Sequence, residues 1–192
     1  MGSETELVLL GWPPEGPTIR LDYRRFSYAG KFVMSTTGKA VLRETDGAED
    51  ETDGEFDDTV LAAVAFDADR TDPGTLRLRY VTVRDDRRGE GLGPRLCRFV
   101  ADRASDRGYD RVAIAVNNPF AYEALYRAGF SFTGVETGLA ELVLARPVEE
   151  LAADRSTGTY QAGLDRYRKR DLSSAEQSFL EDKRDTAPPE PI

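Results

Sequence analysis

The sequence predicts an α/β protein with a helical arm towards its C-terminal end, on three observations. Apolar runs bounded by turn residues alternate with segments of helical spacing through residues 59–145. The order strand, loop, helix, strand, helix over residues 75–128 is typical of a βαβ unit, whose two strands run parallel. Residues 147–192 then change in character and show amphipathic helical spacing.

Length and composition limit what such a fold can carry. At ~150 residues per domain, 192 residues fit one domain with an appendage. We predict a domain over residues 1–146, a helical arm over 147–185 and a disordered tail over 186–192. The single cysteine excludes a disulfide framework, and the absence of histidine excludes triad hydrolases and HExxH zinc proteases, so no metal is expected.

The charge balance limits the partners. The chain carries 26 basic and 35 acidic residues, a net charge of -9, and such a chain repels nucleic acid and anionic membranes. Arginine outnumbers lysine 22 to 4, and this acidic, lysine-poor composition is typical of a halophilic protein from a very salty cytoplasm. No signal peptide or membrane span fits the apolar runs, so we expect a cytoplasmic protein.

The elements follow in order along the chain. An irregular N-terminal stretch with the turn-rich segment Trp12–Pro17 leads to a short strand at Thr18–Asp22. One or two helical turns at Tyr23–Met34 and a strand at Lys39–Thr45 come next. The acidic block 46–58 contains no basic residue, so we expect a solvated loop there, with the binding of a cationic substrate as the weaker hypothesis.

Two strands and a helix follow the acidic block. Thr59–Phe66 and Thr75–Val83 are predicted as a hairpin, joined by the turn Asp67–Gly74. Pro94–Asp106 has helical spacing, and Gly108 ends the helix.

The second half of the βαβ unit and the arm complete the chain. Arg111–Val116 is typical of a buried parallel strand, and Pro119–Ala128 of a helix that begins with proline. Two further strands are predicted at Phe130–Phe132 and Leu139–Ala145. The spacing predicts two amphipathic helices in the arm, one carrying the apolar stripe Tyr160, Leu164 and Tyr167, the other at Ser173–Lys183.

A glycine-rich loop connects the first strand of the βαβ unit to its helix. Gly89, Gly91 and Gly93 remove side chains just before a helix N-terminus, where backbone N–H groups and the helix dipole favour an anion. Arg87 and Arg88 add positive charge that suits phosphate. A dinucleotide fingerprint fails because the third glycine comes one residue early, and a Walker A loop fails because Gly-Lys-Ser/Thr is absent.

The pattern resembles the GNAT (GCN5-related N-acetyltransferase) superfamily. Arg88-Gly-Glu-Gly91-Leu-Gly93 matches the R/Q-x-x-G-x-G/A loop of that family, between a strand and a helix as the family requires. Asn118-Pro-Phe-Ala121 and Leu125-Tyr126-Arg-Ala-Gly129-Phe130 resemble its second motif, N-x-x-A…L-Y…G-F. The resemblance covers roughly residues 59–145.

The resemblance implies a mixed, strongly twisted sheet flanked by helices, whose fourth and fifth strands splay apart to form a wedge for acetyl-CoA. The end of the strand Thr75–Val83 would hydrogen-bond the pantetheine arm, and the amides of the glycine loop would hold the pyrophosphate. The coenzyme-binding residues so implied are Val81, Val83, Arg88, Gly89, Gly91, Leu92, Gly93 and Asn118.

The implied reaction is direct attack of an amine on the thioester, through an oxyanion that backbone N–H groups stabilise. In the family, a tyrosine four residues before the glycine of G-F protonates the leaving thiolate. Leu125 holds that position here, so we assign the role to Tyr126, one residue later, with Tyr122 as the substitute. Four carboxylates remain open as the general base: Asp67, Asp69, Glu123 and Glu136.

Three functions remain to be compared. The leading hypothesis is an acyltransferase that moves the acetyl group of acetyl-CoA to a primary amine of a small molecule or a protein. The first alternative is a catalytically silent CoA-binding sensor or interaction module, because the tyrosine is displaced and no base is evident. A nucleotide-dependent enzyme is the third, against which the loop spacing argues. The family's frequent homodimers leave self-association open.

Overall fold

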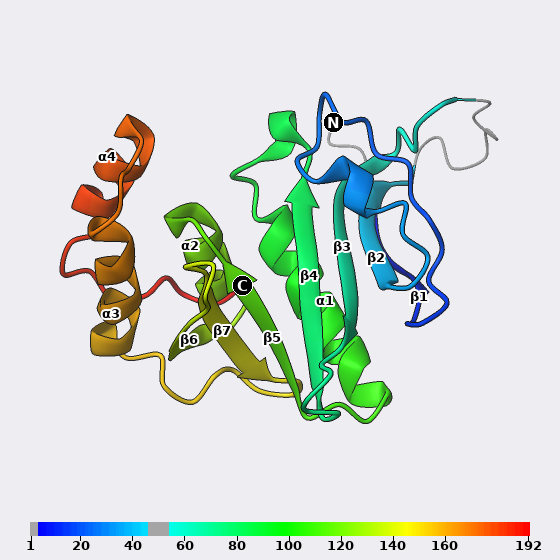
Figure 1. The fold of residues 1–192 in the computed structure, drawn as a ribbon. Coiled ribbons are helices and arrows are strands. Elements are labelled where there is room, and N and C mark those ends of the chain that lie inside the picture. Colours follow the sequence, from blue (N-terminus) through cyan, green and yellow to red (C-terminus); the bar gives the residue numbers. More distant parts are fainter. Residues whose placement is uncertain (1–3, 46–53) are drawn as a thin grey trace.

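A seven-stranded mixed sheet runs through the protein, with its strands in the order β1-β2-β3-β4-β5-β7-β6 (Figure 1). The structure is a computed structural model that describes residues 4–45 and 54–192. Within these ranges, β4 and β5 pair parallel and the other neighbours pair antiparallel. The strands are β1 (Thr5–Gly11), β2 (Gly38–Glu44), β3 (Val60–Ala68), β4 (Thr75–Val83), β5 (Arg111–Val116), β6 (Ser131–Glu136) and β7 (Leu142–Pro147).

α1 and α2 lie on one face of the sheet, and α3 and α4 lie beyond its edge at β6 (Figure 1). α1 packs across β2 to β5, α3 packs on β6, and α4 contacts both α2 and α3. Two short 3-10 turns, η1 (Ala29–Lys31) and η2 (Asp85–Arg87), lie in the connections. The helices are α1 (Leu92–Asp106), α2 (Pro119–Arg127), α3 (Thr157–Arg168) and α4 (Ser174–Asp182).

The interior strand β3 separates two layers of apolar side chains. Val64 and Phe66 belong to the layer under α1, whereas Ala63 and Ala65 belong to a second layer covered by residues 19–32. All four side chains are fully buried. A strand buried on both faces has no polar side to present to water, which explains the continuous apolar run that predicted it.

β4 and β5 are paired only over their first halves. Their ladder runs from Thr75 opposite Arg111 to Leu78 opposite Ile114. Beyond that point β4 pairs with β3 alone and β5 with β7 alone, and the two strands diverge in Figure 1. The splay that the resemblance implies is therefore present in the described sheet, and the predicted parallel pairing is confirmed.

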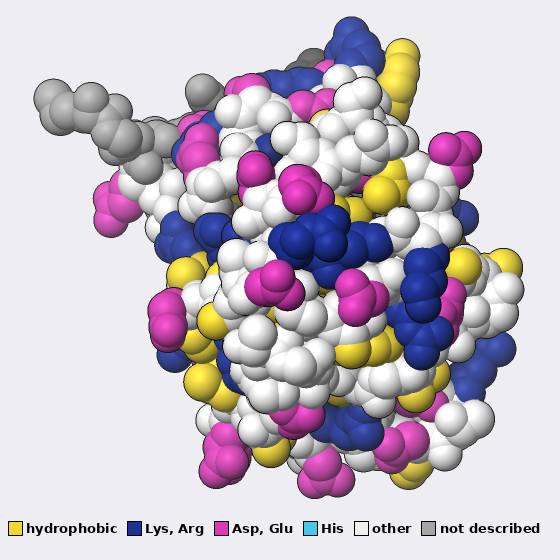
Figure 2. Space-filling model, turned by 90° about the vertical axis from the view of Figure 1, so that its left-hand side faces the viewer, with side chains coloured by type: hydrophobic (Ala, Val, Ile, Leu, Met, Phe, Trp, Pro, Cys, Tyr) yellow, Lys and Arg dark blue, Asp and Glu magenta, His cyan; other side chains and the backbone are white. Residues whose placement is uncertain are grey.

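The C-terminal arm is docked by the apolar stripe that predicted its first helix. Tyr160 and Leu164 are fully buried in the main core, and the hydroxyl of Tyr167 donates a hydrogen bond to Val116 O at 3.1 Å. Ser156 caps α3, and Ser173 forms a capping box with Glu176 at the start of α4. Figure 2 views this side of the molecule, where acidic and basic side chains are mixed.

The N-terminal part differs from the sequence prediction. The stretch expected to be irregular contains the edge strand β1, which pairs with β2. Thr18–Asp22 is not a strand of the sheet. Its Ile19 and Leu21 are instead buried against the sheet face, and Ile19 N–H donates to Phe32 O. The predicted helical turns at Tyr23–Met34 are a series of turns with the short η1.

The predicted boundaries hold best around the βαβ unit. β4 and β5 begin and end at the predicted residues. α1 begins at Leu92, two residues before Pro94, because the left-handed Gly91 forms the N-cap. β6 extends to Glu136, and β7 begins at Leu142 after a turn that Thr137 stabilises.

Residues 186–192, predicted as a disordered tail, are hydrogen-bonded to the arm in the structure. Gln161 Nε2 binds the carbonyl oxygens of Lys183 and Thr186, and Arg155 binds Pro189 O. These arginine and glutamine donors tether a segment whose own prolines cannot donate. The division of the chain at residue 146 stays a prediction.

Part of the acidic block lies outside the described residues, namely 46–53, and its remainder, 54–58, forms bends and turns. In the described part of the chain, no helix has the length and apolar character needed to cross a bilayer. Within the same ranges, no group of three or more His, Cys, Asp or Glu residues is placed to hold a metal ion.

Candidate functional site

The free edge of β4 is the first component of the candidate site. Arg84 donates its N–H to Leu61 O of β3 at 2.9 Å. In an antiparallel ladder only every second residue bonds to a given neighbour, so the residues that face β3 are Arg84 and Thr82. The N–H and C=O groups of Val83 and Val81 therefore point away from β3, towards the side from which β5 has diverged. An extended chain with amide groups can pair with such an edge as an added strand does.

A β-bulge in β4 lies where the two strands part. Ala65 pairs with Tyr80 and Phe66 pairs with Leu78, so Arg79 is an extra residue in β4. The last pair between β4 and β5 is also at Leu78. A bulge leaves backbone groups outside the ladder and bends the strand, and bulges are frequent beside active sites.

The glycine loop places the N-terminus of α1 beside this edge. Gly89 and Gly91 adopt φ of 83° and 77°, a left-handed conformation that glycine adopts without strain. Gly91 is the N-cap and has no side chain to bond the first amides of α1, which come from Leu92 and Gly93. With no acidic residue in the first turn, these amides and the helix dipole form a site suited to phosphate oxygens.

The arginines of the loop are engaged with neighbouring carboxylates. Arg87 pairs with Glu90 at 2.9 Å, and Arg88 pairs with Asp85 at 2.6 Å while donating to Ser27 Oγ. Their charge is partly neutralised, so the expectation that both supply positive charge to a phosphate is weakened. The backbone amides are the main anion-binding groups of this loop.

Asn118 lies at the end of β5, across the splay from β4, where it is the N-cap of α2. Its Oδ1 accepts a hydrogen bond from Ala121 N–H at 2.8 Å, and Pro119 occupies the first helical position. The remaining Nδ2 group makes a 3.5 Å contact with Asn117 Oδ1. Its predicted contact with the coenzyme stays a prediction, now with Nδ2 as the available donor.

The two tyrosines considered as catalytic acids are both fully buried. Tyr126 Oη accepts a hydrogen bond from Phe132 N–H at 3.0 Å and lies 3.4 Å from Tyr122 Oη. Tyr122 in turn donates to Tyr160 O of α3. Burial raises the pKa of both phenols. The role of Tyr126 stays a prediction, but this geometry favours a packing role on the β6 side of α2.

The four carboxylates considered as general bases are all in ion pairs. Asp69 binds Arg77 of β4 near the β3–β4 turn, and Asp67 binds Arg79, the extra residue of the β-bulge. Glu123 is buried between Tyr160 and Lys183 at the base of the arm, and Glu136 binds Arg166 and Arg170.

Thr82 is a residue that the sequence interpretation passed over. It lies on β4 between Val81 and Val83, so its side chain is on the opposite face of the strand. The side chain is buried, and among the described residues its hydroxyl has no hydrogen-bond partner. The sequence could have pointed to Thr82, because this residue stands between the predicted coenzyme-binding residues Val81 and Val83.

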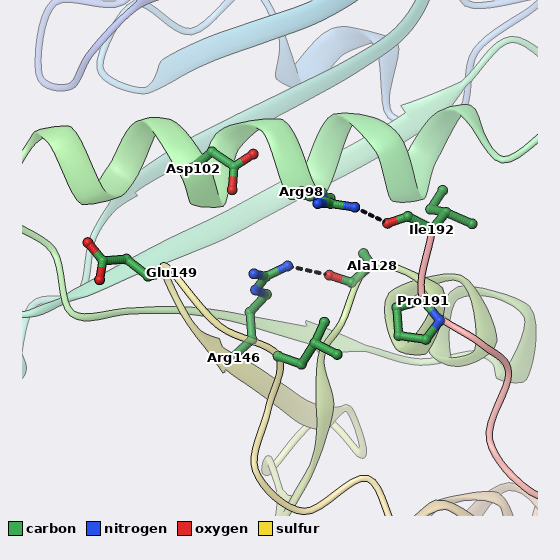
Figure 3. Close-up of a pocket in the computed structure, with 8 residues that line it drawn as sticks. Arg98, Asp102, Ala128, Arg146, Glu149, Pro191 and Ile192 are labelled. Carbon is green, nitrogen blue, oxygen red and sulfur yellow. Dashed lines mark hydrogen bonds between the residues drawn. The ribbon is translucent and has the colours of Figure 1, made fainter.

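A pocket of about 430 Å³ opens between α1 and the C-terminal end of α2 (Figure 3). Arg98 and Asp102 of α1 line one side, and Arg146 of β7 lines the other. Arg146 is buried and donates to Ala128 O at 2.7 Å. Arg98 lies seven residues beyond Gly91, hence on the same face of α1, a spacing visible in the sequence.

Comparison with known proteins gives a family for this arrangement. The sequence model of the Acetyltransferase (GNAT) family matches residues 22–130, more than half of the chain. A search of curated proteins found no match.

Solved structures share the fold. The IAA acetyltransferase from Bacillus cereus ATCC 14579 is 14% identical, with a TM-score of 0.52 over 75% of this chain and 99% of that one. A GCN5-related N-acetyltransferase from Kribbella flavida is 25% identical, with a TM-score of 0.45 over 58% and 67%. PaiA N-acetyltransferase from Thermoplasma acidophilum, in complex with coenzyme A, is 11% identical, with a TM-score of 0.43 over 57% and 59%.

Proposed function

This chain belongs to the GNAT family of acetyltransferases, and from that premise we propose that it transfers the acetyl group of acetyl-CoA to a primary amine. The observation that carries the proposal is the unpaired edge of β4 at Val81 and Val83, which ends beside the N-terminus of α1, where no side chain caps the first amides. A strand edge followed by an anion site matches the chemistry of pantetheine, with its two amides, followed by pyrophosphate.

The coenzyme would be held mainly by the backbone. The amides of pantetheine would pair with Val81 and Val83, and the pyrophosphate would accept hydrogen bonds from Leu92 and Gly93. Asn118, across the splay, would offer its Nδ2 group near the thiol end. Acetyl-CoA would supply the activated acyl group as a thioester.

The transfer itself needs one bond formed and one broken. The neutral amine nitrogen attacks the thioester carbon, and the carbonyl oxygen becomes an oxyanion that backbone N–H groups stabilise. The tetrahedral intermediate collapses with loss of the CoA thiolate, which takes up a proton while the new amide loses one. The bulge at Arg79 leaves backbone groups outside the ladder, and we propose that an N–H there stabilises this oxyanion.

The acceptor is an amine of a small molecule or of a protein. The segment of residues 19–32 covers the face of the sheet opposite α1. It contacts the glycine loop through the hydrogen bond between Ser27 and Arg88. We propose that this segment borders the acceptor side of the site.

A second candidate, a CoA-binding module without catalysis, is favoured by a specific observation. The proposed acid Tyr126 is fully buried, and the carboxylates considered as bases are all paired. Such a protein would bind coenzyme A at the same edge but transfer no acyl group.

Coenzyme binding is tested by thermal shift in molar potassium chloride, with acetyl-CoA, CoA, NAD and ATP. We expect the CoA compounds alone to raise the melting temperature, because only they combine the amides and pyrophosphate that fit. Gly91→Asp and Gly91→Asn form a matched pair, since both residues tolerate the left-handed conformation and differ in charge. The carboxylate should weaken coenzyme binding at least tenfold more than the amide. No shift with any CoA compound overturns the proposal.

Acetyl transfer is tested by release of the CoA thiol in the presence of a panel of amines, detected with an aromatic disulfide reagent. The protein's one thiol does not interfere, because Cys97 is buried and its burial raises the pKa to about 12. Amine-dependent thiol release supports the transferase. Tight CoA binding with no release for any amine supports the silent module instead.

A further inference from the structure

The segment after α4 returns from the arm to the glycine loop. Residues 186–192 run from the arm past α2 to α1, so that the C mark lies between these helices in Figure 1. Three of these seven residues are proline, which makes the segment stiff and extended. The arm therefore delivers its end to one defined place.

Ile192 makes three contacts at that place. Its N–H donates to Arg127 O at the end of α2, at 2.9 Å, and its main-chain oxygen accepts from the guanidinium of Arg98 on α1 (Figure 3). Its Cδ1 atom lies 3.9 Å from the point where a side chain on Gly91 would begin. The segment thus bridges α1 and α2, and the Ile192 side chain lies beside the N-cap of the proposed phosphate site.

The segment is also anchored farther back. Arg155 bonds Pro189 O at 2.9 Å and, with its other amino group, Tyr126 O and Phe130 O at the end of α2. The side chain of Ile192 itself is 44% exposed, so its burial contributes little to docking. A few hydrogen bonds to a stiff segment hold it in place without making it part of the core.

We propose that residues 186–192 form a strap that closes the phosphate end of the coenzyme site and must lift from α1 before the coenzyme can bind. This inference rests on the proposed function. A phosphate chain that reaches the amides of Leu92 and Gly93 would approach along the surface of α1 where Ile192 lies. The main-chain oxygen of Ile192 also occupies a donor of Arg98, a guanidinium on the same face of α1 as Gly91 that could otherwise bind a phosphate oxygen.

Competition between the strap and the coenzyme would lower the observed affinity for coenzyme by a measurable factor. If the strap-closed state is the main state of the free protein, the observed affinity for coenzyme is reduced by the fraction that is open. With about one molecule in ten open, removing the strap tightens binding about tenfold.

Amide hydrogen exchange tests whether the strap lifts. In the full-length free protein, we expect the Ile192 amide to be protected by its bond to Arg127. Saturating CoA should increase exchange at Ile192 while it decreases exchange at Leu92 and Gly93. Protection at both places in the complex overturns the inference, because the strap then stays closed with coenzyme bound.

Two variants test the competition by calorimetric titration with CoA. Deletion of residues 188–192 should tighten binding about tenfold, and Ile192→Gly, which keeps the main chain but removes the side chain that lies beside Gly91, should tighten it by a smaller factor. The matched control is Leu139→Gly, which removes another exposed aliphatic side chain, from the turn between β6 and β7, and should change nothing. Unchanged or weaker binding in both strap variants overturns the inference.

The two proposals fail differently. If neither the full chain nor the deletion variant binds CoA, while both remain folded by circular dichroism, the proposed function fails and the strap has no coenzyme to exclude. If the full chain binds CoA and the deletion does not improve it, the proposed function stands and the strap alone is rejected.

Discussion

The groups that line the proposed coenzyme site are mostly backbone amides, and the side chains around them have other partners. Arg88 pairs with Asp85, and Asn118 caps α2 through its oxygen. Because backbone groups are set by local conformation, the site depends on the left-handed glycines of the loop more than on any single polar side chain.

Thr82 is the residue whose environment is least satisfied. Its buried hydroxyl has no partner in the described structure, so the free protein carries a desolvation cost there. We expect Thr82→Val, which keeps the shape, to raise the free energy of unfolding by about 1 kcal/mol in urea titrations without ligand.

The control for Thr82 is a second buried threonine on the same strand. Thr75 donates its hydroxyl to Asp72 at 2.6 Å, so Thr75→Val should lower the free energy of unfolding by about 1 kcal/mol. Equal losses in both variants contradict an unpaired Thr82 hydroxyl.

At the scale of elements, the contact between α3 and α2 decides how the arm is held. α3 approaches α2 so closely that a Cβ on Gly163 would lie 2.1 Å from Tyr122 Oη. The buried tyrosines of both helices contact each other, with ring centroids of Tyr126 and Tyr160 4.9 Å apart. The arm is thus part of the core and not a loose appendage.

The close approach predicts a large effect of one methyl group. Gly163→Ala should lower the free energy of unfolding by about 3 kcal/mol, because Tyr122 is fully buried and cannot move aside. Gly158→Ala, in the first turn of the same helix, meets only Ser156 Oγ at 3.9 Å and should be neutral or stabilising. Chemical denaturation measures both, and similar effects of the two variants contradict the contact.

The buried tyrosines also predict how the arm responds to alkali. Burial raises the pKa of each of four tyrosines above the value of about 10 expected when unfolded: Tyr122, Tyr126, Tyr160 and Tyr167. The stability they contribute is complete below about pH 10 and is lost as the pH rises above it, because the unfolded phenols ionise first.

Spectroscopic titration checks this sign. Of eight tyrosines, four should show their phenolate absorbance only together with loss of the helical circular dichroism signal. Protein in concentrated urea, in which all tyrosines are exposed, is the reference. A native-state titration in which every tyrosine ionises before any helix is lost would contradict the described burial.

At the scale of the whole molecule, net charge determines how the stability of the protein depends on salt. The net charge of -9 opposes compaction, and salt above about 0.15 M screens charges beyond roughly 8 Å. We propose that the protein works at high salt. The melting temperature should rise with potassium chloride and stay unchanged in sorbitol of equal osmolarity. A melting temperature that is insensitive to salt would contradict this proposal.

The sequence was most informative where local patterns and burial agree. Both strands of the βαβ unit were predicted at their observed bounds, because β4 alternates after the turn signal Asp72-Pro73-Gly74 and β5 is a short apolar run. β1 was missed because the turn-rich segment Trp12–Pro17 directly follows its apolar run at Leu7–Leu10. Thr18–Asp22 was mistaken for a strand because extended chain and strand share one alternation.

The sequence by itself determined the family, the order of the central elements and the glycine loop that ends beside β4. These depend on short-range spacing, which a single chain displays directly. Only the tertiary structure decided that Tyr126 is buried by the arm, that Arg88 contacts Ser27 and that residues 186–192 lie on α1. Those facts depend on which distant segments meet, and pairing between segments far apart in the chain leaves no periodic signal in either one.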